Sequence, residues 1–333
     1  KDNSGSKITV YGGKFHGFNP EDNTAENPQV NFCAPGYGAV ETATGSNIWE
    51  VMPVHTHDFY TGWRWYSTYI DINGSEGLIR LENALEDKGL SINHNVDGFV
   101  TYEGGKWWNQ LATLKETNVK KMYKIEVSGD LEMKLIGNVV DFNEAIEIKT
   151  GYNWIGYPFT KAVNLNEAFA ETFVPAEGDY MISQFQFAFY YNGSWNGSLV
   201  SLNPGEGYIY ERVGDDTELK YNVNNINRNV VKTNISTEDN KWTPNARMYP
   251  NNMTMIAVVD GAIGDNYEVA AFVNGEVRGS ARPIYIEALD AYMMFLTIHG
   301  DEVEEMSFMY YDLTTGESYM LNDRFDYTND AHL

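Results

Sequence analysis

Two closely spaced histidines are the first residues in this chain whose types and spacing could support chemistry. The stretch HTHD places His55 and His57 two residues apart, so on a strand both side chains would project from one face. Imidazoles arranged in this way can share a metal ion, and Asp58 could equally orient one ring without any metal. Two ligands do not complete a metal site. We therefore favour a solvated segment just before Gly62.

Calcium is the one cofactor that the sequence suggests, because hard cations bind clustered carboxylate and amide oxygens in loops. The stretch DGAIGDNYE offers Asp260, Asp265, Asn266 and Glu268. Their spacing differs from that of an EF-hand loop, and ordinary turn chemistry explains the same residues. The sequence therefore leaves two hypotheses for this stretch, a structural calcium site and an ordinary turn without a metal.

Catalytic patterns are absent from the sequence. With 47 acidic residues, many carboxylate pairs will lie close together by chance, and a pair alone does not indicate glycoside hydrolysis. The chain contains no nucleophile elbow of the G-x-S-x-G type and no phosphate-binding glycine loop. The single cysteine, Cys33, has apolar neighbours and no histidine nearby in sequence, which is typical of a buried and inert thiol. We therefore expect a protein that is not an enzyme.

Aromatic side chains beside two predicted turns are the second functional lead. Trp107 and Trp108 follow one turn, and Tyr191 and Trp195 flank another. Exposed aromatic rings can stack on the apolar face of a sugar, so these four residues are candidate ligand-binding residues. Trp107 and Trp195 recur at matching positions of a repeat, which also fits core anchors. Trp108 aligns with Asn196, so it is the better candidate for an exposed ring.

An internal repeat must position these residues. GWRWYSTYI, from Gly62, matches GYNWIGYPF, from Gly151, and residues 98–114 match residues 186–202 without a gap. Each copy predicts an opening strand, a short helix and a hairpin whose turn is Glu-Gly-Gly or Asn-Gly. In the second copy, Asn164 is the expected helix N-cap.

The remaining chain also predicts strands. Four apolar runs after residue 240, with turns at Asn274-Gly275 and Thr315-Gly316, fit a β-sandwich. The asparagine-rich stretch before it is typical of an exposed edge or linker. The fold class is therefore mainly β. It comprises an N-terminal β segment (residues 1–60), two tandem antiparallel β modules with one short helix each (module 1, 61–150; module 2, 151–240) and a C-terminal β-sandwich (241–333).

Charge and hydropathy exclude some partners. The chain has 23 basic and 47 acidic residues, a net charge of -24, which disfavours binding to nucleic acid or to an anionic lipid surface. No apolar stretch approaches the roughly 20 residues of a membrane-spanning helix, so we expect no direct membrane insertion. The aromatic and hydrophobic content is ample for large cores.

Several phrases of the sequence resemble those of a known group of proteins. The phrase GGKFHGFNPEDNTAENPQVNFCAPGYGAVE looks like the end and cap of a right-handed parallel β-helix in proteins of Bacteroidetes-type gut bacteria and their phages. The phrases GYNWIGYP, WNGSLVSLNPGEGY and EVAAFVNGEVRGSARP are similar to modules near the C-termini of secreted or surface proteins of the same bacteria. The first copy departs from this pattern, with KETNVKKMY in place of NPGEGYIY.

The resemblance implies an extracellular, surface-displayed protein but no defined activity. We expect a noncatalytic region that acts in adhesion or as a stalk or scaffold, with a host or microbial surface glycan or protein as partner. The alternative is a glycan-binding accessory region of a polysaccharide-targeting protein. A third hypothesis is a fragment of a β-helix hydrolase or lyase.

Overall fold

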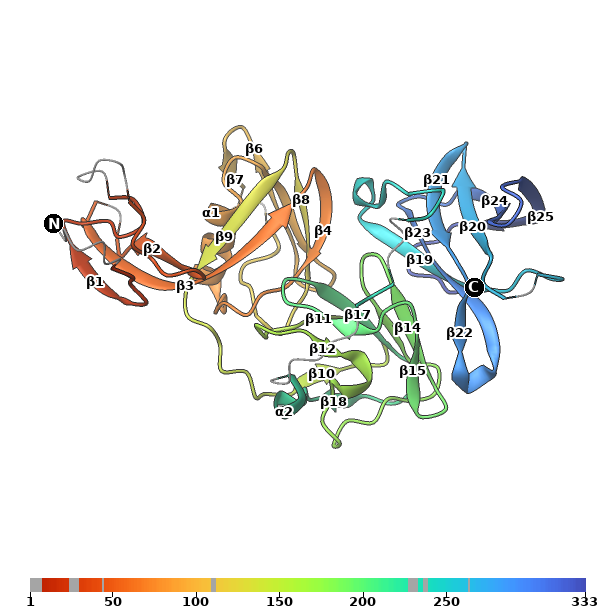
Figure 1. Ribbon diagram of the computed structural model, residues 1–333. Helices are drawn as coiled ribbons and strands as arrows, with labels where there is room; N and C mark the ends of the chain where they lie inside the picture. Colours follow the sequence, from red (N-terminus) through yellow and green to blue (C-terminus); the bar gives the residue numbers. More distant parts are fainter. Residues whose placement is uncertain are drawn as a thin grey trace.

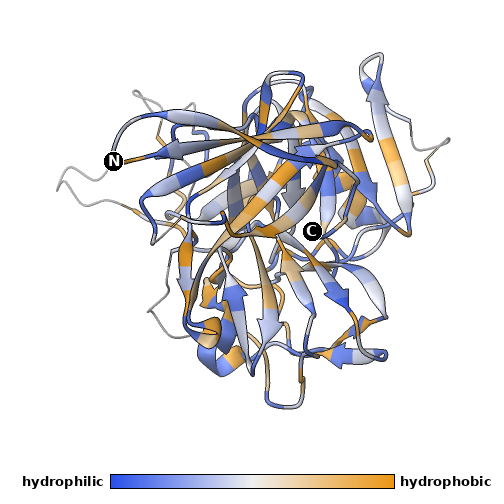
Figure 2. Cartoon of the chain, turned by 90° about the vertical axis from the view of Figure 1, so that its right-hand side faces the viewer, coloured by the Kyte–Doolittle hydropathy of each residue, from blue (hydrophilic) through white to orange (hydrophobic). Residues whose placement is uncertain are grey.

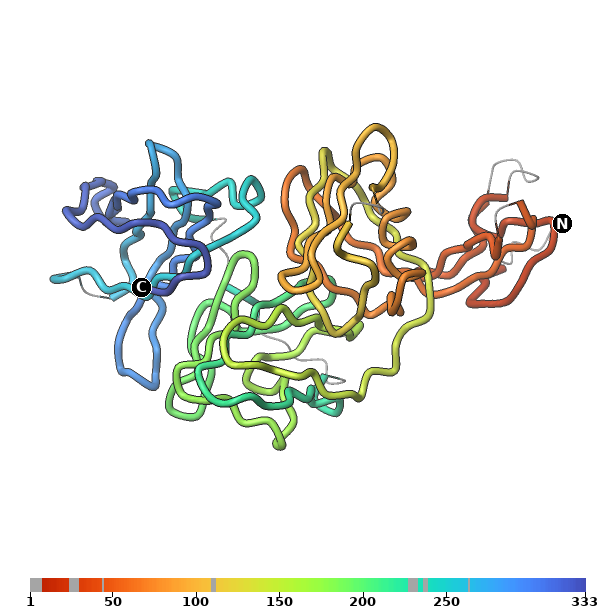
Figure 3. Tube along the Cα trace, turned by 180° about the vertical axis from the view of Figure 1, so that it is seen from behind, coloured from red at the N-terminus to blue at the C-terminus, as the bar shows by residue number. Residues whose placement is uncertain are grey.

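The computed structural model is an extended row of β-sheet units. It describes residues 8–23, 30–43, 45–108, 112–226, 233–235, 239–262 and 264–333. The N-terminal segment lies at one end and the sandwich at the other, with the two modules between them (Figures 1 and 3). The architecture is mainly β with antiparallel strand pairing, as the sequence predicts.

The N-terminal segment is joined to module 1 by one long strand. β3 (Ile48–Phe59) pairs through its first part with β1 (Gly13–His16) and β2 (Tyr37–Glu41), and through its second part with β9 (Leu131–Ile136) of module 1. These pairs are all antiparallel. In the described part of the segment, parallel pairing occurs only at the bridge between Val10 and Cys33, so a β-helix end remains a prediction.

Modules 1 and 2 contain five-stranded sheets with the same strand order. In module 1 the order is β4-β8-β5-β6-β7, and in module 2 it is β11-β17-β13-β14-β15. The first sheet comprises β4 (Gly62–Tyr66), β5 (Gly89–His94), β6 (Gly98–Glu103), β7 (Lys106–Trp107) and β8 (Tyr123–Val127). The second comprises β11 (Gly151–Gly156), β13 (Tyr180–Ile182), β14 (Phe187–Tyr191), β15 (Ser194–Gly197) and β17 (Gly207–Arg212).

Matching side-chain contacts recur in the two modules. The Tyr102 and Trp107 rings pack edge to face with centroids 5.4 Å apart, and so do the Tyr190 and Trp195 rings, also at 5.4 Å. A second contact recurs where the two sequences differ most. The backbone N–H of Asn118 donates to the hydroxyl of Tyr123 at 2.7 Å, and that of Asn203 donates to Tyr208 at 2.7 Å.

The two modules pack against each other with approximate two-fold symmetry. The end of β4 bridges to module 2 through Tyr66 and Glu206, and the end of β11 bridges to module 1 through Ile155 and Lys121. These are equivalent positions exchanged between the copies, which is the pattern of an isologous interface. One continuous apolar core, with buried residues from both modules, runs across the interface.

The helical parts of the modules differ from the sequence prediction. Module 1 contains a ten-residue helix, α1 (Ser75–Ala84), whereas the stretch of module 2 that was predicted as a helix forms one turn of 3-10 helix, η1 (Leu165–Glu167). Asn164 is the N-cap residue of η1, yet its side chain makes no capping hydrogen bond. The predicted linker also contains a short helix, α2 (Val223–Ile226), whose Ile226 is buried in the core.

Short strand pairs complete the modules. β12 (Val163–Asn164) pairs with β16 (Ser201–Leu202), and β10 (Ile146–Ile148) pairs with β18 (Thr217–Leu219).

The C-terminal unit is built from two antiparallel sheets around a separate apolar core. One sheet has the order β19-β23-β22 and the other β21-β20-β24-β25. Hydrophobic and hydrophilic residues alternate along many strands, as expected when one face of a sheet is buried (Figure 2). The strands are β19 (Asn251–Ala257), β20 (Tyr267–Val273), β21 (Glu276–Ala281), β22 (Ile284–Ile286), β23 (Ala291–Gly300), β24 (Glu305–Asp312) and β25 (Ser318–Asp326).

A short helical turn interrupts the sandwich between β22 and β23. This turn, η3, covers Glu287–Leu289, and a similar turn before β19, η2, covers Ala246–Met248.

Candidate functional site

Buried polar and aromatic side chains gather at the surface where the sandwich meets both modules. An apolar cluster, which we call the junction cluster, takes residues from all three units: Trp65, Met122, Ile182, Phe187, Ile209, Ile286 and Phe295. Each of these side chains is almost completely buried. The rings of Phe187 and Phe295, from module 2 and the sandwich, have centroids 5.3 Å apart.

A buried lysine lies beside the junction cluster. Lys124 is 2% exposed, and its Nζ lies 4.5 Å from the ring centroids of both Trp65 and Trp154, which occupy equivalent positions in the two modules. The ammonium group donates to the Oδ1 atom of Asn251 at 2.7 Å. Burial lowers the pKa of Lys124 from 10.5 to about 8, although Asp330 opposes this shift.

Hydrogen bonds across the same surface attach the sandwich to the modules. The side-chain amide of Asn252 donates to the carbonyls of Ser183 and Gln184 at 3.1 Å each. The indole N–H of Trp65 donates to the carbonyl of Pro250 at 2.9 Å. Near the C-terminus, the His332 ring stacks on Tyr180 with centroids 4.1 Å apart.

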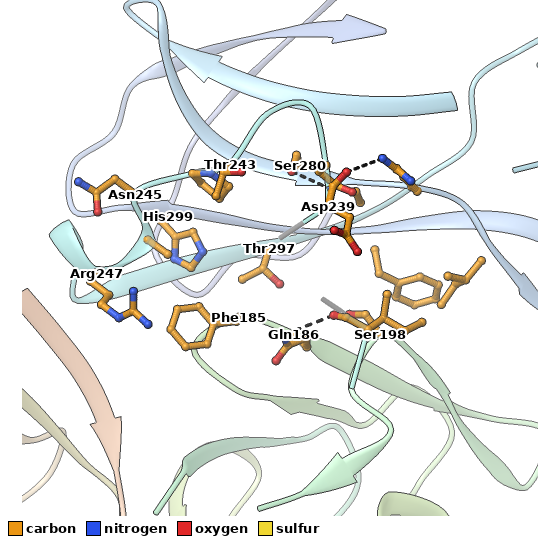
Figure 4. Close-up of a pocket in the computed structure, with 18 residues that line it drawn as sticks. Phe185, Gln186, Ser198, Asp239, Thr243, Asn245, Arg247, Ser280, Thr297 and His299 are labelled. Atoms are coloured by element: carbon orange, nitrogen blue, oxygen red, sulfur yellow. Dashed lines mark hydrogen bonds between the residues drawn. The ribbon is translucent and has the colours of Figure 1, made fainter. Parts of the chain in front are cut away.

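A cavity of about 420 Å³ opens beside this junction, between module 2 and the sandwich (Figure 4). Phe185 and Gln186, in the turn between β13 and β14, line it from module 2. Thr297 and His299 on β23 line the sandwich side, and the third wall is the segment 239–247 that leads into β19. The cavity therefore exists only when these three parts of the chain are assembled.

Arg247 supplies a cation to this cavity. Its guanidinium carbon lies 4.7 Å from the Tyr60 ring centroid and 5.7 Å from that of Phe185. Arg64 contacts the same Phe185 ring at 5.8 Å and also lies 3.8 Å from Glu206. Within the described residues, by contrast, no carboxylate forms an ion pair with Arg247.

Two other polar atoms of the cavity lack hydrogen-bond partners in the described chain. The Thr297 hydroxyl and the Arg282 Nε are buried and make no hydrogen bond to any part of the chain that the structure describes. The Arg282 Nε lies 3.7 Å from the carboxylate of Glu268, and the Nη2 of Arg282 donates to the carbonyl of Asp239 at 2.6 Å.

His299 also lines the cavity. Burial, with a smaller effect of Arg278, lowers the pKa of His299 to about 3, so this imidazole is neutral at physiological pH.

The aromatic residues predicted from the sequence lie on the hairpins of two different modules. Trp195 is 7% exposed and belongs to the core, and Trp107 packs against the core and donates its indole N–H to the carbonyl of Glu82. Trp108 is half-buried, with the Lys106 ammonium 4.1 Å from its ring centroid. Tyr191 is 42% exposed. These four rings do not form one platform, because β7 and β15 lie apart (Figure 1).

The predicted calcium ligands also separate in the structure. Glu268 is fully buried, and its carboxylate accepts the backbone N–H groups of Lys241 and Trp242. Asp260, Asp265 and Asn266 are exposed in the turn before β20. In the part of the chain that the structure describes, no three His, Cys, Asp or Glu side chains gather as a metal-binding group. Calcium binding remains a prediction.

The two histidines are not in a solvated segment, so that expectation is wrong. His55 and His57 lie on the second half of β3, and their side chains face the same side of the strand. His55 is 4% exposed, and its Nδ1 lies 2.8 Å from the hydroxyl oxygen of Thr68. Both rings pack against Tyr66, because β3 is covered by module 1 and by the loop around Gly205 of module 2. Burial lowers the pKa of His55 to about 4. Burial also lowers the pKa of His57 to about 3, and the charges of Arg64 and His55 add to this effect.

Cys33 is partly exposed rather than buried, which corrects the sequence prediction. Partial burial and the nearby Glu21 carboxylate both raise the pKa of its thiol, so the thiolate is disfavoured.

Comparisons with protein-family models, curated proteins and solved structures found no match to this chain. None of the helices in the described residues has both the length and the apolar character needed to cross a bilayer.

Sequence patterns did not reveal the cavity residues, since Phe185, Arg247 and Thr297 come from three distant parts of the chain. The one signal available was the placement of arginine and polar residues around KWTPNARMYP, in an otherwise strongly acidic chain.

Proposed function

We propose that this region is a noncatalytic scaffold or stalk of an extracellular surface protein, in which the units are held as one rigid body. The junction cluster supports this proposal most directly, because it places apolar side chains of both modules and the sandwich in one buried group. Units joined only by flexible linkers would move relative to each other, whereas a large apolar interface opposes such motion.

Two further features support rigidity. The long strand β3 belongs to the sheet of the N-terminal segment and also pairs with β9 of module 1, so no linker separates these units. The two modules share one apolar core. A chain built in this way would hold its two ends apart, which is what a stalk requires (Figure 3).

Small-angle X-ray scattering of the purified chain tests this proposal. The scattering curve should fit one elongated particle, and it should change when the sandwich is detached. Asn252→Asp removes the side-chain donor to two module 2 carbonyls and places a carboxylate in the buried junction. The sandwich should then detach from the modules, which increases the maximum dimension of the particle. Asn322→Asp, at an exposed site on β25 of the same sandwich, is the matched control.

A wild-type curve that requires an ensemble of arrangements would contradict the rigid scaffold. Surface location is tested separately, since antibodies against this chain should label intact cells of the source organism without permeabilisation. Labelling only after lysis would overturn the assignment to the cell surface.

A further inference from the structure

We propose that the cavity between module 2 and the sandwich binds a carboxylate-bearing sugar, such as one uronic acid unit of an acidic polysaccharide. Its volume of about 420 Å³ lies within the range of small-molecule sites, roughly 300–1,000 Å³. Its lining combines apolar side chains, including Phe295 and Ile284, with convergent polar groups, as is usual where a small polar ligand is oriented.

Arg247 is the group that would bind the carboxylate. A guanidinium group offers a planar fork of N–H donors that fits a carboxylate in a bidentate manner. The rings of Tyr60 and Phe185 contact this guanidinium group, and contacts with ring faces leave its N–H donors for a ligand. Because no protein carboxylate pairs with Arg247 within the described residues, an anionic ligand would supply the missing charge.

The rest of the cavity fits hydroxyl groups. Buried polar atoms almost always have hydrogen-bond partners, but the Thr297 hydroxyl and the Arg282 Nε have none in the described chain. Asp239 adds a carboxylate that can accept from a sugar hydroxyl, and Gln186 adds an amide that can donate and accept (Figure 4). A sugar hydroxyl both donates and accepts, so a ring carrying several of them can satisfy this mixed set.

A purely inorganic anion would leave most of these groups unpaired, and a neutral sugar would leave Arg247 unpaired. The combination of one unpaired cation, Arg247, with a buried hydroxyl and a buried guanidinium N–H that lack hydrogen-bond partners in the described chain therefore points to a ligand with one carboxylate and several hydroxyls.

Isothermal titration calorimetry of the full chain tests the proposal with four probes: glucuronate, galacturonate, glucose and acetate. At least one uronate should bind saturably, and it should bind at least about tenfold more tightly than glucose or acetate, which corresponds to about 1.4 kcal/mol. Acetate binding as tightly as the uronates would overturn the sugar assignment. Failure of both uronates to bind would overturn the site.

Variants locate the binding. Arg247→Gln should weaken uronate binding at least about tenfold, because it removes a charge-assisted hydrogen bond. Thr297→Val keeps the shape of the side chain and should weaken binding severalfold, so it provides a second test if Arg247→Gln disturbs the fold. Arg324→Gln, on the exposed strand β25, is the charge-matched control and should bind as the wild type does. Unchanged binding in both cavity variants, or equal loss in the control, would refute this location.

Discussion

Replacement of Lys124 by methionine should make the protein no less stable at pH 7, although it removes a hydrogen bond and two contacts with tryptophan rings. The reason is the cost of burying the charge. The folded-state pKa is about 8, compared with 10.5 for a free lysine, a difference of 2.5. At about 1.36 kcal/mol for each pKa unit, keeping Lys124 charged at pH 7 costs roughly 3 kcal/mol.

The pH dependence gives the sharper test. The folded-state pKa of Lys124 is lowered, so between about pH 8 and 10.5 the unfolded chain binds the proton more strongly than the folded protein does. The cost of the buried charge is therefore fully present below pH 8 and declines as pH rises. Linkage predicts that this cost declines by roughly 1 kcal/mol between pH 7 and pH 9. The stability advantage of Lys124→Met over the wild type should shrink by the same amount.

Urea unfolding monitored by tryptophan fluorescence, at pH 7, 8 and 9, measures this difference. Other titrating groups are common to both proteins and cancel when the wild type is compared with the variant. Lys134→Met removes the charge of a lysine on the exposed side of β9 and serves as the control. A Lys124→Met advantage that stays constant from pH 7 to pH 9, or one that changes equally in Lys134→Met, would refute the reasoning.

Three further predictions concern packing and pH. Gly205→Ala should destabilise the protein more than Gly193→Ala. Both glycines have positive φ, but only at position 205 would a Cβ collide with the His57 ring. Thermal unfolding of the two variants measures this difference. Trp195→Ala should cost about 3–5 kcal/mol of unfolding free energy and Trp108→Ala much less, because only the former is fully packed in the core; equal losses in urea unfolding would contradict this. His57→Phe should flatten the loss of stability on acidification. The folded-state pKa of His57 is about 3, so protonation of the unfolded chain lowers the stability of the wild type by roughly 2–3 kcal/mol between pH 6 and pH 4. Unfolding curves at both pH values should show this difference.

Short-range features of the fold could be predicted because they depend on residues that are close in sequence. Asn192-Gly193 and Asn274-Gly275 both adopt the positive φ values that the hairpin prediction requires. The mainly β class followed from the alternation of aromatic and polar residues. The 3-10 turn in place of a helix in module 2 was not predictable, because the apolar stripe that begins at Leu165 fits one turn as well as several.

The candidate site was much less predictable than the fold. His55 and His57 alternate as expected on a strand, and the sequence determined that they share a face, but it could not determine what covers that face. Module 1 and the Gly205 loop bury them, which changed a predicted solvated segment into an interior one. Trp108 was recognised as the unrepeated ring, yet Lys106 covers part of it.

By itself, the sequence determined the repeat, the strand-and-turn pattern and the strongly acidic balance of this protein, since all three are local or additive properties. Only the tertiary structure decided that Trp65 and Trp154 enclose Lys124 and that Arg247 faces a cavity without an ion-pair partner among the described residues. The physical reason is that burial and pairing depend on which distant surfaces pack together. The apolar junction cluster determines that packing through contacts between residues more than a hundred positions apart.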